Sequence, residues 1–453
     1  MAPIGCIGYS SAVASIKIKK LEADKRLSVP LPTNPDIVIV GAGSSGLSAA
    51  KKLEELGASY LVIEASGRIG GRAYTESNTF GQPVDHGCSW ISGSNDNIFS
   101  DLGKKNNFTL VDHSNPKIEM FERDGARSTQ ANINEYNKSE FKIKEILQDT
   151  GRQGIDIPAS KVIPKVPYNE CFQNWEGALN YAVDIDQIST AEYWHLKNTQ
   201  PSLIVKEGLG NLVATLNNNF PISLSTSVLE MDLSGKGVKV LTSKGLIDAK
   251  ACICTVSVGV LQSEKIKFTP NLSNKIQKAV HDIQMGLLVK IPLLFDGVRL
   301  GFAENSLVQY DISKEDIGNE CYFLAWPTGH NYMVGFIGGQ FAWNLSKLGE
   351  KEIVEYALSK LESLSGGNIR KHFLKGFASN WANNPLTKGS YSAVKPGCFG
   401  AREVLSEPIA EKLIFAGEAT AGNLSGLVNG AYESGKMAAA RLANIVKQKS
   451  NSL

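Results

Sequence analysis

The sequence lacks any long apolar run. A helix that crosses a bilayer needs about 18 consecutive apolar residues, and no stretch reaches that length, including the C-terminal KQKSNSL. We therefore predict no transmembrane anchor and a soluble protein, either cytoplasmic or periplasmic/secreted. The N-terminal extension, residues 1–35, leaves the compartment open. Its weak apolar stretch from Ile4 to Ile16 includes Ala12-Val13-Ala14 but follows no basic residue, so it reads either as a degenerate export signal or as a disordered lead-in.

An excess of one charge and the usual metal-ligand patterns are also missing. The net charge is only +2 and no long basic stripe is present, which argues against nucleic acid as the main partner. The seven cysteines follow neither a zinc nor a disulfide spacing, and the six histidines form no HExxH pattern, so we predict no metal. Cys252 and Cys254 lie in an apolar, strand-like run from Ala251 to Val260. We expect two buried thiols on one face, with a redox pair as the alternative.

The sequence does contain a complete nucleotide-binding β-α-β unit, which begins IVIVGAGSSGL. The β-branched residues 37–40 predict a buried strand that leads directly into three glycines. Gly41 permits a tight turn, Gly43 lets the backbone approach a pyrophosphate, and Gly46 lets the next helix pack against the strand. Ser45 lies at the N-terminus of that helix, whose free amides and positive dipole end would face the phosphates.

A second strand, Tyr60 to Ile63, ends in Glu64. Glu64 follows Gly43 by about 20 residues, the spacing at which a carboxylate meets an adenosine ribose hydroxyl. A lone glycine motif is weak evidence, but strand, glycines, helix, second strand and terminal acid occur here in register. The unit therefore predicts a bound dinucleotide.

The turn Gly70-Gly71-Arg72 follows and would add backbone amides and a guanidinium to the same diphosphate. With this turn, the chain resembles the flavin-dependent amine oxidase family, which includes the monoamine oxidases and polyamine oxidases. Family-like segments recur at Asp85–Trp90, Val228, Lys290, Trp381–Pro396 and Phe415–Gly435. The resemblance implies bound FAD.

The resemblance also implies an α/β fold in which a Rossmann-like FAD-binding domain is interleaved with an α+β, mixed-sheet substrate domain. We assign residues 36–90, 203–285 and 373–447 to the FAD-binding domain. Residues 91–202 and 286–372 then form the substrate-binding domain. The middle of the FAD-binding part alternates like a β-meander, and residues 350–364 show helical spacing of apolar residues.

Three residues are catalytic candidates on this resemblance. Lys290 lies in the apolar run MGLLVKIPLLF, where a buried ammonium would be costly without a function, and it matches the family lysine that contacts flavin N5 through water. Tyr391 and Trp381 lie in WANNPLTKGSYSAVKPG and match aromatic residues beside the flavin ring. Such a wall orients an amine and excludes water.

The same resemblance assigns further residues to the cofactor. Glu418 matches a carboxylate in the ribityl and phosphate region, and Val228 matches a backbone contact to the adenine. A helix that begins near Val428 would present its N-terminus to the pyrimidine edge. Ser390 stands where monoamine oxidases carry a flavin-linking cysteine, so non-covalent FAD is expected.

Two substitutions in the substrate pocket depart from the family. Leu427 replaces the second tyrosine of the monoamine oxidase cage, which leaves Tyr391 as half a cage. Ser92 stands where several polyamine oxidases have an acidic residue or histidine, so no cation anchor is visible there. The sequence therefore does not name the amine.

The resemblance implies an FAD-dependent oxidase that converts a mono- or polyamine to an imine or aldehyde. Only one dinucleotide fingerprint is present. Flavoprotein reductases usually need a second one for NAD(P)H, so O2 is the expected acceptor and H2O2 the product. An L-amino-acid oxidase of the same superfamily is an alternative, although VDHGCSW replaces its arginine motif. A flavoprotein with a non-oxidase role is another, and a homodimer is left open.

Overall fold

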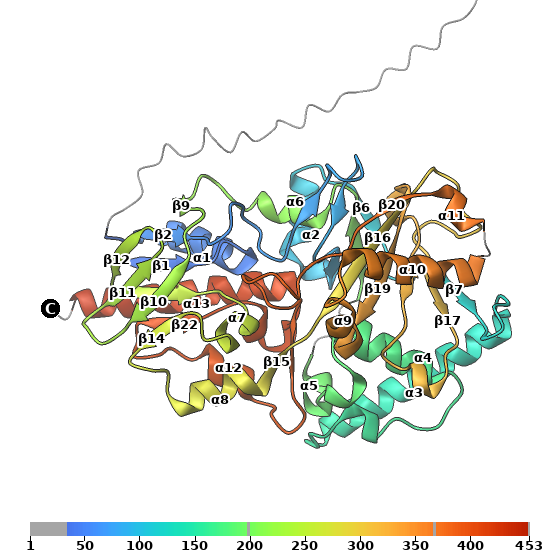
Figure 1. The fold of residues 1–453 in the computed structure, drawn as a ribbon. Coiled ribbons are helices and arrows are strands. Elements are labelled where there is room, and N and C mark those ends of the chain that lie inside the picture. Colours follow the sequence, from blue (N-terminus) through green and yellow to red (C-terminus); the bar gives the residue numbers. More distant parts are fainter. Residues whose placement is uncertain (1–33, 197–199, 366–367, 452–453) are drawn as a thin grey trace, which may run out of the picture.

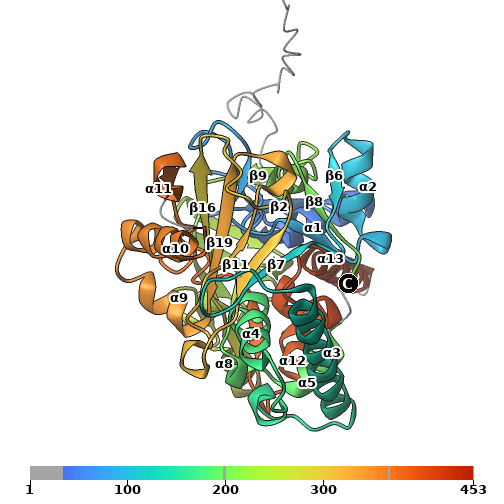
Figure 2. The ribbon, with the colours of Figure 1, turned by 90° about the vertical axis from the view of Figure 1, so that its right-hand side faces the viewer.

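The computed structural model describes residues 34–196, 200–365 and 368–451. Apart from its last two residues, the N-terminal extension lies outside these ranges, and the prediction made for it is not addressed. The chain forms two bodies that lie side by side (Figure 1). A quarter turn of the molecule looks onto the second body, with its long strands in front (Figure 2).

The first body is built on a five-stranded parallel sheet. Its strands, in spatial order, are β22 (Leu413–Phe415), β13 (Ala251–Cys254), β1 (Ile37–Val40), β2 (Tyr60–Ile63) and β9 (Ile222–Ser223). All four residues of β1 are buried, because both faces of the sheet are covered. A parallel sheet covered in this way reads as a continuous apolar run and not as an alternating one.

Helices cover one face of this sheet, and a second sheet with further helices covers the other. Ile37 and Ile39 pack with α1 (Ser44–Glu55) and α13 (Val428–Asn451). Val38 and Val40 pack with the opposite layer. The elements of that layer are β12 (Gly245–Ala249), β11 (Val238–Thr242), β10 (Val228–Asp232), β14 (Lys267–Thr269), α7 (Val258–Gln262), α8 (Asn274–Asp282) and α12 (Ala401–Ser406).

The apolar run from Ala251 to Val260 is divided between two elements. Strand β13 ends at Cys254, and α7 begins at Val258 with the Ser257 side chain accepting a hydrogen bond from Val260 N. Serine is a typical N-cap residue, so a helix begins here and the strand does not continue through the run. Cys252 and Cys254 are fully buried free thiols in one core cluster, so the expectation of buried thiols on one face is confirmed.

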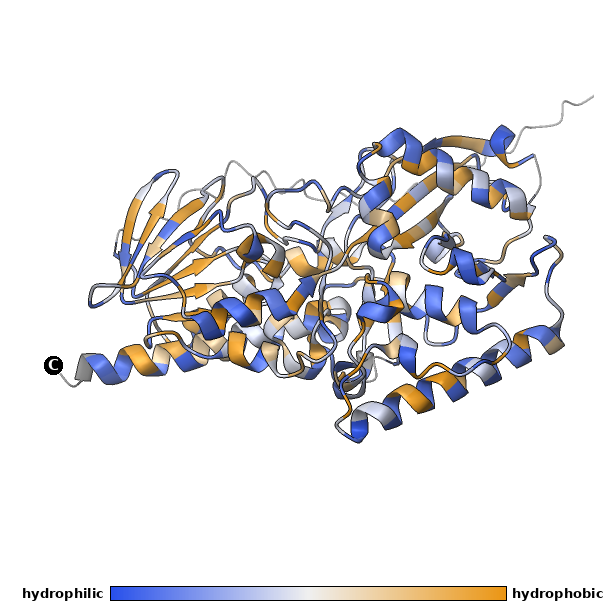
Figure 3. Cartoon of the chain, turned by 60° about the horizontal axis from the view of Figure 1, so that its bottom comes forward, coloured by the Kyte–Doolittle hydropathy of each residue, from blue (hydrophilic) through white to orange (hydrophobic). Residues whose placement is uncertain are grey.

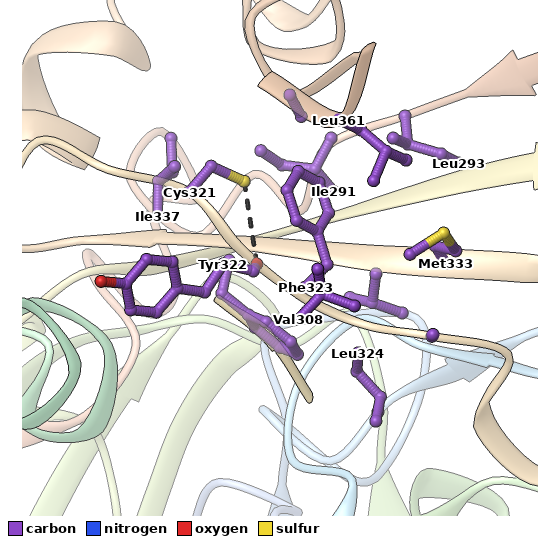
Figure 4. Close-up of a cluster of buried hydrophobic side chains, with 14 of the residues drawn as sticks. Ile291, Leu293, Val308, Cys321, Tyr322, Phe323, Leu324, Met333, Ile337 and Leu361 are labelled. Carbon is purple, nitrogen blue, oxygen red and sulfur yellow. Dashed lines mark hydrogen bonds between the residues drawn. The ribbon is translucent and has the colours of Figure 1, made fainter. Parts of the chain in front are cut away.

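The second body is built on a six-stranded sheet of mixed direction. Its strands are, in order, β20 (Phe373–Gly376), β16 (Leu288–Phe295), β19 (Tyr332–Gly338), β18 (Tyr322–Leu324), β17 (Leu307–Tyr310) and β7 (Ile118–Phe121). Figure 4 shows apolar side chains of these strands packed together with Leu361. Leu361 belongs to α10 (Glu350–Ser365), which forms over the segment where the sequence shows helical spacing.

Other helices pack around this sheet and complete the second body. They are α3 (Gln130–Arg152), α4 (Asn169–Gln173), the π-helix η4 (Asn174–Tyr181), α5 (Thr190–His195), α9 (Gly339–Leu345) and α11 (Ile369–His372). Figure 3 shows apolar residues concentrated in the strands of both bodies, whereas the surface helix α3 alternates polar and apolar residues. Its buried residues recur at helical spacing, which fixes the face that packs inward.

The remaining elements are shorter. They are β3 (Thr75–Glu76), β4 (Val84–Asp85), β5 (Trp90–Ser92), α2 (Ile98–Lys105), β6 (Leu110–Asp112), β8 (Ser202–Val205), α6 (Leu209–Ala214), β15 (Ile283–Met285) and β21 (Ser392–Val394). Short helical turns occur at Ser94–Asp96, Ala159–Lys161, Ile185–Gln187, Lys314–Asp316, Pro327–Gly329, Glu418–Thr420 and Gly422–Leu424.

The domain division stays a prediction, but two of its boundaries differ from the way the segments pack. Phe99 of α2 belongs to the core around β1, so a limit at residue 91 cuts through the first body. Strand β20 pairs with β16, so residues 373–376 lie in the second body. Within the ranges that the structure describes, no helix is long and apolar enough to cross a membrane.

Candidate active site

A cavity of about 1580 Å³ opens between the two bodies and is lined by residues of both. Sites for a single drug-sized molecule usually measure about 300–1,000 Å³. The cavity therefore has room for an extended cofactor and a second molecule. One part of it is formed by the loops that follow β1 and β2, and another by β16, η4 and residues 381–391.

The loop Gly41–Ser45, called the dinucleotide loop below, forms the wall of the cavity nearest β1. Gly41 has φ +101°, and a Cβ there would lie 2.4 Å from Thr255 Oγ1, so only glycine fits. Gly43 is the N-cap of α1, has no side chain to cap the helix, and forms a bridge with Gly70. The first amides of α1 are therefore directed at the cavity.

A buried hydroxyl in this loop has no partner in the protein. Ser45 is 4% exposed and lines the cavity, yet its Oγ makes no hydrogen bond. Buried polar groups are nearly always satisfied. An orphaned hydroxyl beside free helix amides and a glycine cradle therefore fits a phosphate-bearing cofactor such as FAD.

Gly46 and Glu64 complete the nucleotide-binding unit in different ways. Gly46 does not line the cavity; a Cβ on it would lie 1.8 Å from Gly41 O, so its absence lets α1 pack against the loop. Glu64 lines the cavity, and its carboxylate accepts hydrogen bonds from Ala42 N at 2.7 Å and Ser66 N at 2.8 Å. These bonds fix the position of a carboxylate that retains lone pairs for a ribose.

Arg72 and Glu418 form an ion pair in the wall of the cavity. Arg72 Nη1 donates to Glu418 Oε1 at 2.9 Å and to Ser390 O at 2.8 Å. The other Glu418 oxygen accepts from Ser392 Oγ at 2.7 Å and from Gly426 N at 3.2 Å. Burial alone would raise the pKa of Glu418, but Arg72, Arg402 and the Ser392 hydrogen bond outweigh it and lower that pKa. Glu418 is therefore ionised near neutral pH.

Sequence reasoning missed a second buried pair behind the first. Arg402 Nε donates to Glu192 Oε1 at 2.6 Å, and Arg402 Nη1 donates to Ser392 Oγ at 2.7 Å. Arg402 thus shares Ser392 with Glu418 and extends the charge network. No local pattern signals this pair, because its members lie 210 residues apart.

Lys290 lies on β16 and reaches the cavity with only 5% of its surface exposed. Its Nζ donates to Ser89 Oγ and, at 3.4 Å, to Asp85 O, and it lies 5.5 Å from the centre of the Trp90 ring. Burial lowers the pKa of Lys290, and the charge of Asp85 opposes that shift. The amine is thus easier to deprotonate than an ordinary lysine.

The two predicted aromatic residues are both fixed by hydrogen bonds to backbone. Trp381 Nε1 donates to His86 O at 2.9 Å, and Tyr391 Oη donates to Leu179 O at 3.0 Å. Ser390 Oγ accepts from Leu288 N at 2.7 Å and donates to Gly286 O at 3.1 Å. Both rings line the cavity in fixed orientations.

The remaining predicted residues also line this cavity: Gly71, Ser92, Val228, Leu427 and Val428. Ser44 Oγ donates to Val428 O at 2.9 Å, which joins the N-terminal ends of α1 and α13. The structure therefore brings all the predicted site residues except Gly46 to one cavity. The individual roles assigned to them stay predictions.

Further residues in the wall carried no sequence signal that we recognised. They include Trp175, Glu176, Tyr181 and Phe336 in the second body. The one available hint was the acid in the otherwise mainly apolar segment NWEGAL. Across the described ranges, no group of His, Cys, Asp and Glu is arranged to hold a metal ion.

Comparisons with known proteins agree with this geometry. Residues 101–443 match the family model of flavin containing amine oxidoreductases, and residues 39–104 match an NAD(P)-binding Rossmann-like domain. The chain is 31% identical to Polyamine oxidase 4 of Oryza sativa subsp. japonica, over 89% of this chain and 88% of that protein. It is 30% identical to Polyamine oxidase 2 of Arabidopsis thaliana, over 90% and 87%.

A solved structure of a putrescine oxidase with redesigned cofactor binding shares the fold. Its TM-score is 0.74 at 17% identity, with 91% of this chain and 99% of that chain covered. The α/β fold with a Rossmann-like unit and the FAD cofactor expected from the sequence are thus confirmed. The chain belongs to the flavin-containing amine oxidoreductase family and is an FAD-dependent amine oxidoreductase.

Proposed function

We propose that this enzyme oxidises an alkyl amine, mono- or polyamine, to an imine that water hydrolyses to an aldehyde, with O2 as the electron acceptor. The observation that carries the proposal is that one cavity holds both groups of residues. It joins the dinucleotide loop, Glu64 and Arg72 to a site formed by Lys290, Trp381 and Tyr391. An amine bound at the second part would lie next to a cofactor held by the first.

The protein residues supply position and exclusion of water. When bound, FAD supplies a two-electron acceptor for the α C–H bond of the amine. The Trp381 and Tyr391 rings, held by backbone carbonyls, would restrict the amine to a geometry in which that bond can react. Lys290, with its lowered pKa, is placed to hold or pass a proton at the same end of the cavity.

The reaction balances with O2 and water as the co-reactants. The amine loses two electrons and two protons to become an imine, and O2 gains these two electrons and two protons to become H2O2. Water then adds to the imine carbon, and the C–N bond breaks to give an aldehyde and an amine or ammonia. The single dinucleotide fingerprint of the sequence supports O2 over a nicotinamide as acceptor, because a nicotinamide would need its own folded site.

A substrate without a carboxylate is favoured by the lining of the cavity. The arginine motif expected of an amino-acid oxidase is absent from the sequence after the Gly70–Arg72 turn. In the described wall, Arg72 already donates to Glu418 and Ser390. The two plant relatives named polyamine oxidases favour a substrate with several amino groups.

A panel of amines with peroxide detection tests the proposal. Primary monoamines, diamines, spermidine and aromatic amino acids are each supplied to the FAD-loaded enzyme in air, and H2O2 and aldehyde are measured. We expect equimolar peroxide and aldehyde from at least one amine and none from amino acids. Turnover of amino acids alone would overturn the proposal and support the amino-acid oxidase alternative.

The attachment of the cofactor is a separate expectation. Ser390 has no thiol, and its hydroxyl is held by Leu288 N and Gly286 O, so no covalent link forms at this position. Acid precipitation should therefore release all FAD into the supernatant, where its absorbance is measured. Flavin that remains in the washed pellet would contradict this expectation.

A further inference from the structure

One carboxylate in the cavity wall has no place in the proposed chemistry. Glu176 lies on the π-helix η4, is 4% exposed and lines the cavity. Helical turns of the π type are rare in proteins, and those that occur are often found at functional sites. A buried carboxylate is costly unless its charge is compensated, so its position beside an open cavity needs a reason.

The neighbours of Glu176 leave it undercompensated. Asn180 Nδ2 donates to Glu176 Oε1 at 3.2 Å, and the Tyr193 hydroxyl is a second hydrogen-bond partner. Lys144 attracts both Glu176 and Glu140, and its close ion pair, at 2.7 Å, is with Glu140. Two carboxylates therefore share one ammonium, and with both carboxylates ionised the group would carry a net charge of −1.

A second carboxylate of the same wall provides the contrast. Glu192 also lines the cavity, but both of its oxygens are occupied, one by Arg402 and the other by Val394 N. Glu192 is thus part of the framework. Glu176 has no arginine partner and faces the cavity with one neutral amide, one hydroxyl and a lysine shared with Glu140.

Two aromatic rings lie close to Glu176 in the wall of the cavity. Tyr193 is its hydrogen-bond partner, and Tyr181 stacks on Tyr193 with ring centres 5.8 Å apart. Aromatic faces attract alkylammonium groups. A carboxylate beside aromatic rings is a suitable site for an ammonium on an alkyl chain.

The helix η4 also connects this group to the reacting end. Tyr391 Oη donates to the carbonyl of Leu179, three residues after Glu176 on η4. Lys290, Trp381 and Tyr391 thus share one cavity with Glu176. We expect a single extended substrate in this cavity to contact both ends.

We infer that Glu176 binds a second, non-reacting ammonium group of the substrate and so selects diamines and polyamines over monoamines. This inference rests on the proposed function and deepens it. It also supplies the cation anchor that is absent at Ser92. Glu176 is then a residue that determines specificity, and no step of the oxidation passes through it.

The electrostatics of the wall agree with this role. Burial raises the pKa of the Glu176 carboxyl and Glu140 raises it further, whereas Lys144 opposes the rise. A bound ammonium would stabilise the ionised carboxylate and replace solvation that burial removed. Binding a dication therefore relieves an unfavourable charge, which a monoamine cannot do.

The test compares two substrates that differ in one charge. Reduction of the flavin by 1,8-diaminooctane and by octylamine is measured anaerobically in the FAD-loaded wild type and in Glu176→Gln, with Glu145→Gln as the control. Glu145 lies exposed on α3 and does not line the cavity. We expect Glu176→Gln to lower the apparent second-order rate constant for the diamine by about 10- to 100-fold, the range for one charged hydrogen bond. Octylamine should be nearly unaffected, and Glu145→Gln should change neither value.

A second variant moves the preference in the opposite direction. Lys144→Gln removes the ammonium that competes for the carboxylates, so the ratio of diamine to monoamine reactivity should rise. If Glu176→Gln loses its flavin on purification, this ratio in Lys144→Gln decides, and an unchanged ratio overturns the inference. Equal loss for both amines in Glu176→Gln, or no diamine preference in the wild type, also overturns it. If no amine reduces the wild-type flavin, the proposed function itself fails.

Discussion

At the residue scale, the wall of the cavity contains two kinds of buried charge. Glu418 is compensated by two arginines and by Ser392, so its charge is part of a stable framework. Lys290 has hydrogen bonds to a hydroxyl and a carbonyl, and burial is the main influence on its pKa. The first kind of charge holds the site together, whereas the second is retained at a cost to stability.

The contribution of Glu64 and Arg72 to FAD binding is tested by Glu64→Ala and Arg72→Ala. Glu64 also orders the amides of Ala42 and Ser66, and Arg72 pairs with Glu418. Each change should therefore weaken FAD binding by about tenfold or more, with little effect on the spectrum of the flavin that stays bound. FAD titration of the apoprotein measures this. Glu54→Ala, at an exposed position of α1, is the control, and unchanged affinity in both variants would refute our reading of this unit.

Lys290→Met should stabilise the enzyme while slowing flavin reduction. The pKa of Lys290 in the folded protein lies below its usual value of 10.5. At pH values below this lowered pKa, the buried charge therefore decreases the free energy of unfolding. This destabilisation disappears as the pH rises toward 10.5, where the lysine is neutral in the folded protein. Methionine removes it, so the free energy of unfolding should rise by roughly 1 kcal/mol or more at neutral pH and gain less near pH 10.

Thermal unfolding of the FAD-saturated variant at both pH values checks this prediction. Lys371→Met, at an exposed position, is the control. A loss of stability at neutral pH would show that the bonds of Lys290 to Ser89 and Asp85 outweigh its desolvation.

At the element scale, the sequence predicted best where one local rule dominates. Residues 37–40 form a strand, α1 follows the glycines, and α10 forms where apolar residues have helical spacing. The run 251–260 resembles one strand because most of its residues are apolar, and the Ser257 cap that divides it is a weak signal. The π-helix η4 had no signal, because its wide turn depends on packing against other segments.

The close packing of α1 on its loop is tested by Gly46→Ala. The added Cβ would lie 1.8 Å from Gly41 O, so the helix must move away from the strand. Overpacking of this kind costs about 1–3 kcal/mol, and the displaced helix amides should also weaken FAD binding. Gly235→Ala, where nothing lies within 4 Å, is the control in urea unfolding and FAD titration. Wild-type values for Gly46→Ala would contradict the packing argument.

At the scale of the whole molecule, the site exists only because distant segments meet. The pair Arg72–Glu418 spans 346 residues, and the bond from Tyr391 to Leu179 spans 212. Composition and periodicity carry no information about such contacts, so the predicted residues on this wall came from the family resemblance. Glu192, Arg402 and Glu176 matched no motif that we used, and only the folded chain shows them.

The pH dependence of turnover tests how this assembled cavity treats its substrate. The amine must react as the free base, because only a free nitrogen lone pair can stabilise the developing imine. An alkyl amine has a pKa near that of lysine, about 10.4, so the rate constant for flavin reduction at low amine concentration should rise about tenfold per pH unit well below it. The rise should flatten where the bound amine loses its proton. Anaerobic stopped-flow reduction between pH 6 and pH 10 measures this profile. A rate that is flat or falls with pH would mean that the ammonium form reacts, and the site beside Lys290 would then not select the neutral amine.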